Sequence, residues 1–209
     1  MQQMNPMGQG QQTTNFQTST NMPPQMNHGA LDVLSTNHLL SSINSAFNEF
    51  LLCEQHIKDP ELMDILNRQR SFLTDQYNIT VEAFRSGQDP SHPTSSYQMT
   101  QSNDVIYGLK PSQPSKPNQD VSQLGDKCIA SLMLGCMKKL ASETLKAASE
   151  STNPVTRRVL ADSIPNYLEM AYETFLYMNK KGYYQIPQLK QEDTQQLLQS
   201  HTTAPTHLQ

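Results

Sequence analysis

Residues 126–184 decide the fold, and they read DKCIASLMLGCMKKLASETLKAASESTNPVTRRVLADSIPNYLEMAYETFLYMNKKGYY. Apolar residues recur here at steps of three, four and seven, which is the period of an amphipathic α-helix. Asn153 and Pro154 interrupt the pattern. Asn is a good N-cap, and Pro suits the first helical position because its missing N–H would be unpaired there. The sequence therefore predicts a helical hairpin, with helices over about 126–151 and 154–181.

A similar pattern occupies the first half of the chain. Apolar residues fall in helical phase before Asp59–Pro60 and again after it, until Gly87. A shift of 94 residues places Asp59–Pro60 on Asn153–Pro154. Two hairpins with one apolar stripe per helix can bury those stripes only against each other or against a partner. We therefore expect an all-α, ferritin-like four-helix bundle of two helical hairpins with one long crossover and disordered termini.

The residues in helical phase are expected to face the core. They include Leu40, Ile43, Phe47, Phe50 and Leu51 in the first helix, Leu62, Ile65, Leu66, Phe72 and Leu73 in the second, Ile129, Leu132, Met133, Met137 and Leu140 in the third, and Val155, Val159, Tyr167, Leu168 and Phe175 in the fourth. Pro165 lies inside the fourth helix and should kink or loosen one turn, because it removes an N–H donor. The Met-bearing stripe of the third helix could alternatively face another protein, since Met surfaces adapt to partners.

Composition divides the chain into five segments. Residues 1–28 form a Gln/Asn/Met-rich tail, and residues 185–209 form a Gln-rich C-terminal tail with a short helix near Leu197. The two hairpins occupy 29–87 and 120–184. Residues 88–119 contain five prolines (Pro90, Pro93, Pro111, Pro114 and Pro117) and several serines, which predicts a linker rather than a packed element. The tails serve either as tethers to neighbouring proteins or as solubilising spacers, and composition alone does not separate these roles.

Charge and cysteine usage exclude several classes of function. The net charge is −4, so we expect no nucleic-acid partner. No apolar run approaches the roughly 20 residues that span a bilayer, and the uncharged residues 1–27 do not resemble a signal peptide. We therefore expect no membrane insertion and no export. Three cysteines without a CxxC motif indicate small buried side chains rather than a disulfide framework.

The second hairpin resembles the coat F domain of endospore-forming bacteria. The matching features are Asp126-x-x-Ile129-Ala130, the Asn153–Pro154 turn followed by Arg157–Arg158, and Tyr177-Met178-x-x-Lys181-Gly182-Tyr183-Tyr184. The first hairpin, with His38 near its start and Asp59-x-Glu61-Leu62 at its turn, is similar to the N-terminal half of longer family members. Two departures are Pro165 within a helix and Gly125 where a Ser or Asn cap is expected.

The resemblance implies a ferritin-like fold and a structural or accessory place in the spore coat, after synthesis in the mother-cell cytoplasm. It implies no known reaction, so we expect no enzyme, no catalytic residues and no cofactor. The implied partners are other spore coat proteins, with homo-oligomerisation as an open alternative.

A di-metal iron or manganese site is the alternative function. Such bundles use one Glu from each of two helices and Glu-x-x-His from each of the other two. The candidates here are Glu49 and Glu143, with Asp75 and Glu169 in the second positions. Asn78 and Tyr172 occupy the places of the two histidines, and Glu49 and Asp75 are staggered by roughly 7 Å at 1.5 Å per residue. We therefore expect no metal site.

Overall fold

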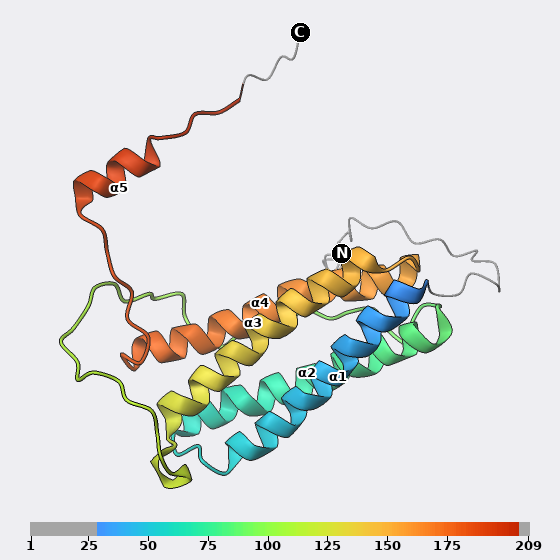
Figure 1. Ribbon diagram of the computed structural model, residues 1–209, viewed down its shortest axis with the longest axis horizontal. Coiled ribbons are helices and arrows are strands. Elements are labelled where there is room, and N and C mark those ends of the chain that lie inside the picture. Colours follow the sequence, from blue (N-terminus) through green and yellow to red (C-terminus); the bar gives the residue numbers. More distant parts are fainter. Residues whose placement is uncertain (1–28, 205–209) are drawn as a thin grey trace, which may run out of the picture.

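The computed structural model describes residues 29–204, in which the regular elements are helices and no strand is formed (Figure 1). The helices are α1 (Ala30–Glu54), α2 (Pro60–Ser86), α3 (Asp126–Glu150), α4 (Pro154–Lys180) and α5 (Gln191–Leu198), with a 3-10 turn η1 (Val121–Gln123) before α3. The predicted all-α fold is confirmed, and α5 is the short helix expected near Leu197. The predicted N-terminal tail and residues 205–209 lie outside the described residues.

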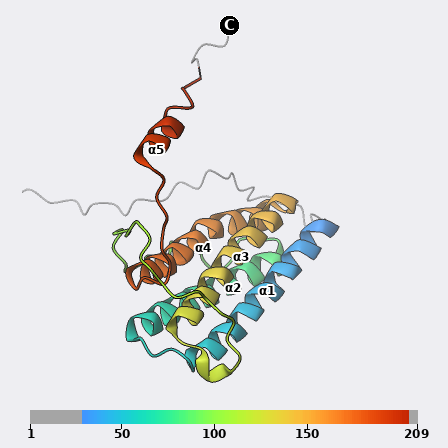
Figure 2. The ribbon, with the colours of Figure 1, turned by 60° about the vertical axis from the view of Figure 1, so that its left-hand side comes forward.

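The four long helices form a bundle of two hairpins. Helix α1 packs on α2 and α3, while α4 packs on α3 and α2 (Figures 1 and 2). The end of α2 lies beside the start of α4, where the Asn153 side chain donates to the Gly87 carbonyl at 3.3 Å. The start of α3 lies at the other end, where Asp126 accepts from the Lys58 N–H at 2.8 Å. The crossover between α2 and α3 must therefore run the length of the bundle.

Both predicted hairpin turns have the caps that the sequence indicated. The Asp59 carboxylate accepts from the Glu61 N–H at 2.9 Å, and the Asn153 side chain accepts from Val155 N and Thr156 N, each at 3.0 Å. Gly87 ends α2 with φ at 66°, a left-handed conformation that costs glycine little. Helix α4 continues through Pro165 to Lys180, so the proline does not end it.

The core is built from the apolar stripes of all four helices, and its largest fully buried side chains include Tyr167, Tyr177 and Phe50. Met133 and Met137 are fully buried, so the Met-bearing stripe is core rather than a partner surface.

Three leucines expected in the core face solvent instead. Leu51, Leu132 and Leu168 are 54%, 52% and 56% exposed. Each is the sequence neighbour of a buried residue, respectively Phe50, Met133 and Tyr167, and adjacent residues point about 100° apart on a helix with 3.6 residues per turn. The buried stripe is therefore narrower than the sequence pattern suggested.

Part of the crossover is packed, which differs from our expectation for residues 88–119. Tyr97 is buried in the core cluster, and its N–H donates to the Asn166 side chain on α4 at 2.8 Å. Further along, Ile106 N donates to the Asn179 side chain at 2.7 Å. The prolines do not prevent this packing, because the crossover uses side chains of α4 as hydrogen-bond partners instead of forming a helix or strand.

A pair of leucine variants tests the position of the core. Leu66→Ala leaves a cavity among fully buried neighbours and should lower the free energy of unfolding by roughly 2–5 kcal/mol. Leu168→Ala changes an exposed side chain and should alter it by no more than about 0.5 kcal/mol. Urea unfolding followed by circular dichroism measures both. Equal destabilisation by the two variants would contradict the observed orientation of α4.

Candidate functional site

The four carboxylates considered for a metal site lie on four different helices. Glu49 is exposed on α1, and Glu143 on α3 lies 3.8 Å from both the His38 ring and the Lys139 ammonium. Asp75 on α2 pairs with His92 of the crossover at 3.2 Å. Glu169 is half-buried on α4.

The expected histidine positions supply no metal ligand cluster. Asn78 is exposed, and Tyr172 stacks on Phe175 with ring centroids 5.8 Å apart. Within residues 29–204, no three His, Cys, Asp or Glu side chains are grouped so that they could hold a metal ion. The described bundle therefore brings no metal-binding set together from these candidates.

A polar cluster at the interface of α2, α4 and the crossover centres on the buried Glu173, which the sequence analysis did not single out. Its side chain is fully buried, and Arg68 of α2 donates to it with both terminal nitrogens, at 2.8 and 3.2 Å. The crossover contributes the Tyr97 hydroxyl and the Thr100 N–H, which also donate to this carboxylate. Glu173 therefore joins α2, α4 and the crossover at one point.

The electrostatics of this cluster favour a fixed ion pair. Burial by itself would lower the pKa of Arg68, but the hydrogen bonds that Arg68 donates to Glu173 and Asp64 outweigh it and raise that pKa. Burial raises the pKa of Tyr97, and the adjacent Glu173 carboxylate raises it further. Each oxygen of Glu173 accepts at least two hydrogen bonds from the chain itself. Both oxygens of the carboxylate are therefore occupied by donors of the same chain, which leaves little capacity to accept hydrogen bonds from a ligand.

A sequence signal for Glu173 does exist. It follows Met170 by three residues and precedes Tyr177 by four, so it lies on the apolar stripe of α4. A carboxylate on such a stripe needs a buried partner. The sequence does not reveal that the partners come from α2 and the crossover, because those segments meet Glu173 only in the folded bundle.

Two aspartates fasten the hairpins to each other at opposite ends of the bundle. Asp32 of α1 is buried and accepts from the Asn153 N–H at 3.2 Å and from the Ser151 hydroxyl at 3.1 Å, in the α3–α4 turn. Asp126 of α3 accepts from the Lys58 and Asp59 N–H groups at 2.8 and 3.1 Å, in the α1–α2 turn. Each hairpin therefore satisfies backbone donors at the turn of the other.

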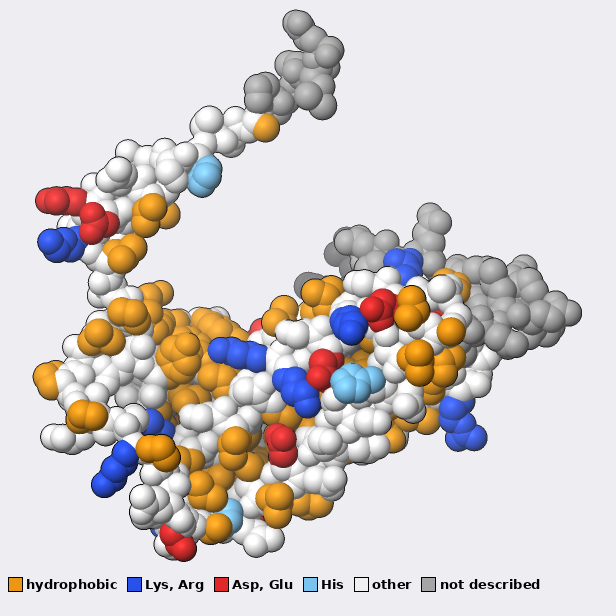
Figure 3. Space-filling view, viewed as in Figure 1, with side chains coloured by type: hydrophobic (Ala, Val, Ile, Leu, Met, Phe, Trp, Pro, Cys, Tyr) orange, Lys and Arg blue, Asp and Glu red, His pale blue; other side chains and the backbone are white. Residues whose placement is uncertain are grey.

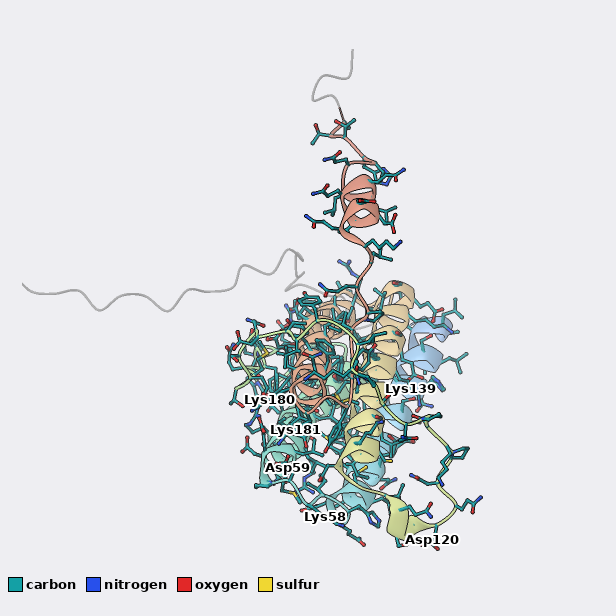
Figure 4. All side chains as sticks on the ribbon, turned by 90° about the vertical axis from the view of Figure 1, so that its left-hand side faces the viewer. Lys58, Asp59, Asp120, Lys139, Lys180 and Lys181 are labelled. Carbon is teal, nitrogen blue, oxygen red and sulfur yellow. The ribbon has the colours of Figure 1, made fainter. Side chains whose placement is uncertain are left out.

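A smaller charged cluster lies at the α1–α2 turn (Figure 4). The Lys181 ammonium lies 2.6 Å from the Asp59 carboxylate, and the Tyr177 hydroxyl donates to the same carboxylate at 3.0 Å. The hydrogen bond from Lys181 is the main cause that holds the pKa of Asp59 below its usual range. Burial raises the pKa of Tyr177, and the neighbouring Asp59 adds to that effect.

The cysteines are separate thiols, with Cys53 buried and Cys128 and Cys136 half-buried. Burial raises the pKa of Cys136 to about 12, and the nearby Glu49 carboxylate contributes to the shift. The thiol is therefore protonated and a weak nucleophile near neutral pH.

These contacts define a class of protein: a helical bundle whose buried polar side chains hold its helices and crossover together. Comparison with known proteins then identifies the family. A family model described as the Coat F domain matches residues 125–202. A Bacillus subtilis (strain 168) protein named Spore coat protein F-like protein YhcQ is 44% identical over 176 residues, which cover 84% of this chain and 81% of that protein. The chain belongs to the spore coat protein F family.

The recognition from motifs in the second hairpin is thereby confirmed, and the relative extends the likeness into the first hairpin. No solved structure matches the chain. Across residues 29–204, none of the helices is both long enough and apolar enough to span a bilayer.

The contacts of Glu173 predict that a single substitution there strongly lowers the stability of the bundle. Glu173→Gln removes the buried charged partner of Arg68, which keeps only the more exposed Asp64, and should lower the free energy of unfolding by about 3 kcal/mol. Tyr97→Phe removes one hydrogen bond to the same carboxylate and should cost about 1 kcal/mol. Hydrogen exchange at residues 97–100 should rise more in Glu173→Gln than in Tyr97→Phe. Unchanged exchange in both variants would show that Glu173 does not hold the crossover.

The ion pair between Asp59 and Lys181 predicts that the free energy of unfolding depends on pH in the acid range. Because the pKa of Asp59 is lowered by folding, its contribution is present above the unfolded pKa of about 3.9 and is lost as the pH falls through the folded value. Asp59→Asn keeps a capping side chain but removes the charge, so it should cost about 1 kcal/mol or less at pH 7.

The difference in the free energy of unfolding between Asp59→Asn and the unaltered chain, measured by urea unfolding, should shrink between pH 5 and pH 3. This range is set by the Asp reference pKa of about 3.9. Lys181→Met should reproduce the effect, because it removes the principal partner of Asp59. A difference that stays constant across this range would contradict the role of the Asp59 charge.

Proposed function

We propose that this chain is a structural or accessory component of the bacterial spore coat, without catalytic activity, and that other coat proteins are its partners. The observation that carries the proposal is the 44% identity to a relative named as spore coat protein F-like, over most of both chains. We further propose that the chain is made in the mother-cell cytoplasm and reaches the coat through its partners.

The use of polar residues in the bundle supports a structural role. The buried carboxylates of Asp32 and Glu173 accept hydrogen bonds from other segments of the same chain. A catalytic carboxylate needs to reach a substrate, whereas both of these are enclosed among protein donors. Of the other candidates, Glu49 lies exposed on α1, and Asp75 lies on α2 beside His92.

Localisation during sporulation tests the proposal. A fluorescent fusion of the full chain should accumulate around the developing spore, and unfused fluorescent protein expressed from the same promoter should not. The fusion should remain with the purified spore. Diffuse fluorescence confined to growing cells would contradict a place in the coat.

Metal loading tests the di-metal alternative in the same preparation. We expect elemental analysis after incubation with iron or manganese and desalting to find far less than one metal ion per chain. A Glu49→Gln and Glu143→Gln double variant should give the same value as the unaltered protein. Stoichiometric metal that disappears in the double variant would instead establish the di-metal function.

A further inference from the structure

The last part of the crossover is longer than its connecting task requires. The crossover begins beside the start of α4, and at Gly108 it has already passed the other end of α4, where the Gly108 N–H donates to a carbonyl just beyond that helix at 2.9 Å. Asp126 at the start of α3 and Lys181 at the end of α4 both contact Asp59, so these two helix ends lie at the same end of the bundle. Residues 109–125 connect them, and an extended chain of that length reaches about 55 Å, whereas packed helices are only about 8–10 Å apart.

This surplus length projects from the bundle and is held only at its two ends. The Lys110 N–H donates to the Gln185 side chain on one side, and the Asn118 side chain donates to Cys128 Sγ at 3.2 Å on the other. Between these anchors, no residue from 111 to 117 forms a hydrogen bond or ion pair in the described structure, and all of them are exposed. The loop bows away from the helices in Figures 1 and 4, and Figure 3 shows hydrophobic side chains, a class that includes proline there, on its surface.

The sequence of this loop favours one extended backbone conformation. Residues 110–117 read KPSQPSKP, and six of these eight residues are prolines or directly precede one. Proline fixes φ near −65°, and the residue before a proline is restricted to the extended region. Both restrictions favour the polyproline II helix, which has three residues per turn and no internal hydrogen bonds. Pro111, Pro114 and Pro117 are spaced by three, so in this helix they line one edge, with about 9 Å from one proline to the next.

The charge of the loop gives the proline edge a direction. Residues 105–119 contain Lys110 and Lys116 and no carboxylate, although the whole chain is acidic. The order Pro111-x-x-Pro114-x-Lys116 places a lysine at one end of the edge. Aromatic-lined grooves of the SH3 type bind PxxP segments, because the preformed polyproline II helix loses little entropy on binding. A carboxylate at the end of such a groove pairs with the basic residue and selects the orientation of the bound segment.

We propose that residues 110–117 are a docking segment for a partner protein with a groove of the SH3 type. Aromatic side chains of that groove contact Pro111 and Pro114, and a carboxylate at its end pairs with Lys116. A loop that served only as a spacer would need neither the three-residue proline period nor a lysine at this position. The inference adds the kind of partner to the proposed coat role but does not require that role, because purified proteins suffice to test it.

Titration of the full chain into a panel of nitrogen-15-labelled SH3 domains tests the proposal by NMR. The panel consists of domains that have a carboxylate at the end of the groove and prefer PxxPx-Lys or PxxPx-Arg ligands. At least one domain should show saturable shifts confined to its aromatic groove. Pro114→Ala should raise the dissociation constant at least about tenfold, and Lys116→Glu should do the same because it replaces attraction by repulsion. Circular dichroism should confirm that the variants fold like the unaltered chain, since residues 111–117 make no contact that holds the bundle.

Two matched controls separate recognition of the pattern from general stickiness. Lys110→Glu makes the same charge change on another exposed lysine, outside the Pro-x-x-Pro-x-Lys order, and should change the dissociation constant less than about twofold. Pro93→Ala removes an exposed proline of the same crossover and should leave binding unchanged. Equal weakening by Lys110→Glu and Lys116→Glu would show attraction by charge alone and would overturn the proposal. Groove shifts with none of the domains, or binding that Pro114→Ala leaves intact, would overturn it as well.

Discussion

Burial of the helix stripes between the two hairpins is the constraint on which the rest of the structure depends. A single hairpin has helices with an apolar face that its own two helices cannot cover. Packing α1 on α3 and α2 on α4 covers those faces and produces a common core that contains Phe50, Leu66, Met137 and Tyr167. This arrangement separates the end of α2 from the start of α3, so a long crossover is a consequence of the packing rather than an independent feature.

Buried polar side chains then fix which surfaces meet. An apolar stripe alone tolerates sliding and rotation, but a buried carboxylate is costly unless its donors are in place. Asp32 and Asp126 find those donors at the turn of the opposite hairpin, one at each end of the bundle. Glu173 finds them on α2 and the crossover. Three acidic residues thus set the register of the hairpins and the path of the connection between them.

The two hairpins are related but not identical. Helices α2 and α4 begin 94 residues apart, at Pro60 and Pro154, as the sequence shift indicated, whereas α1 and α3 begin 96 residues apart, at Ala30 and Asp126. The turn at 55–59 is longer than the turn at 151–153, and this accounts for the difference between the two shifts of 94 and 96 residues. Matching positions in sequence, such as Glu49 and Glu143, therefore do not imply matching positions in space. In the bundle, Glu49 of α1 lies beside Cys136 of α3, while Glu143 of α3 lies beside His38 of α1.

The sequence by itself determined the helices, their caps at Asp59 and Asn153, and the pairing into hairpins, because helical period and capping act over a few neighbouring residues. Its motifs also identified the family. Only the tertiary structure decided that Leu132 and Leu168 face solvent, that Tyr97 is buried, and that Glu173 joins three segments. These facts depend on contacts between residues about 30 to more than 100 positions apart. Their cause is the angle at which one stripe meets another, and no local pattern along the chain records that angle.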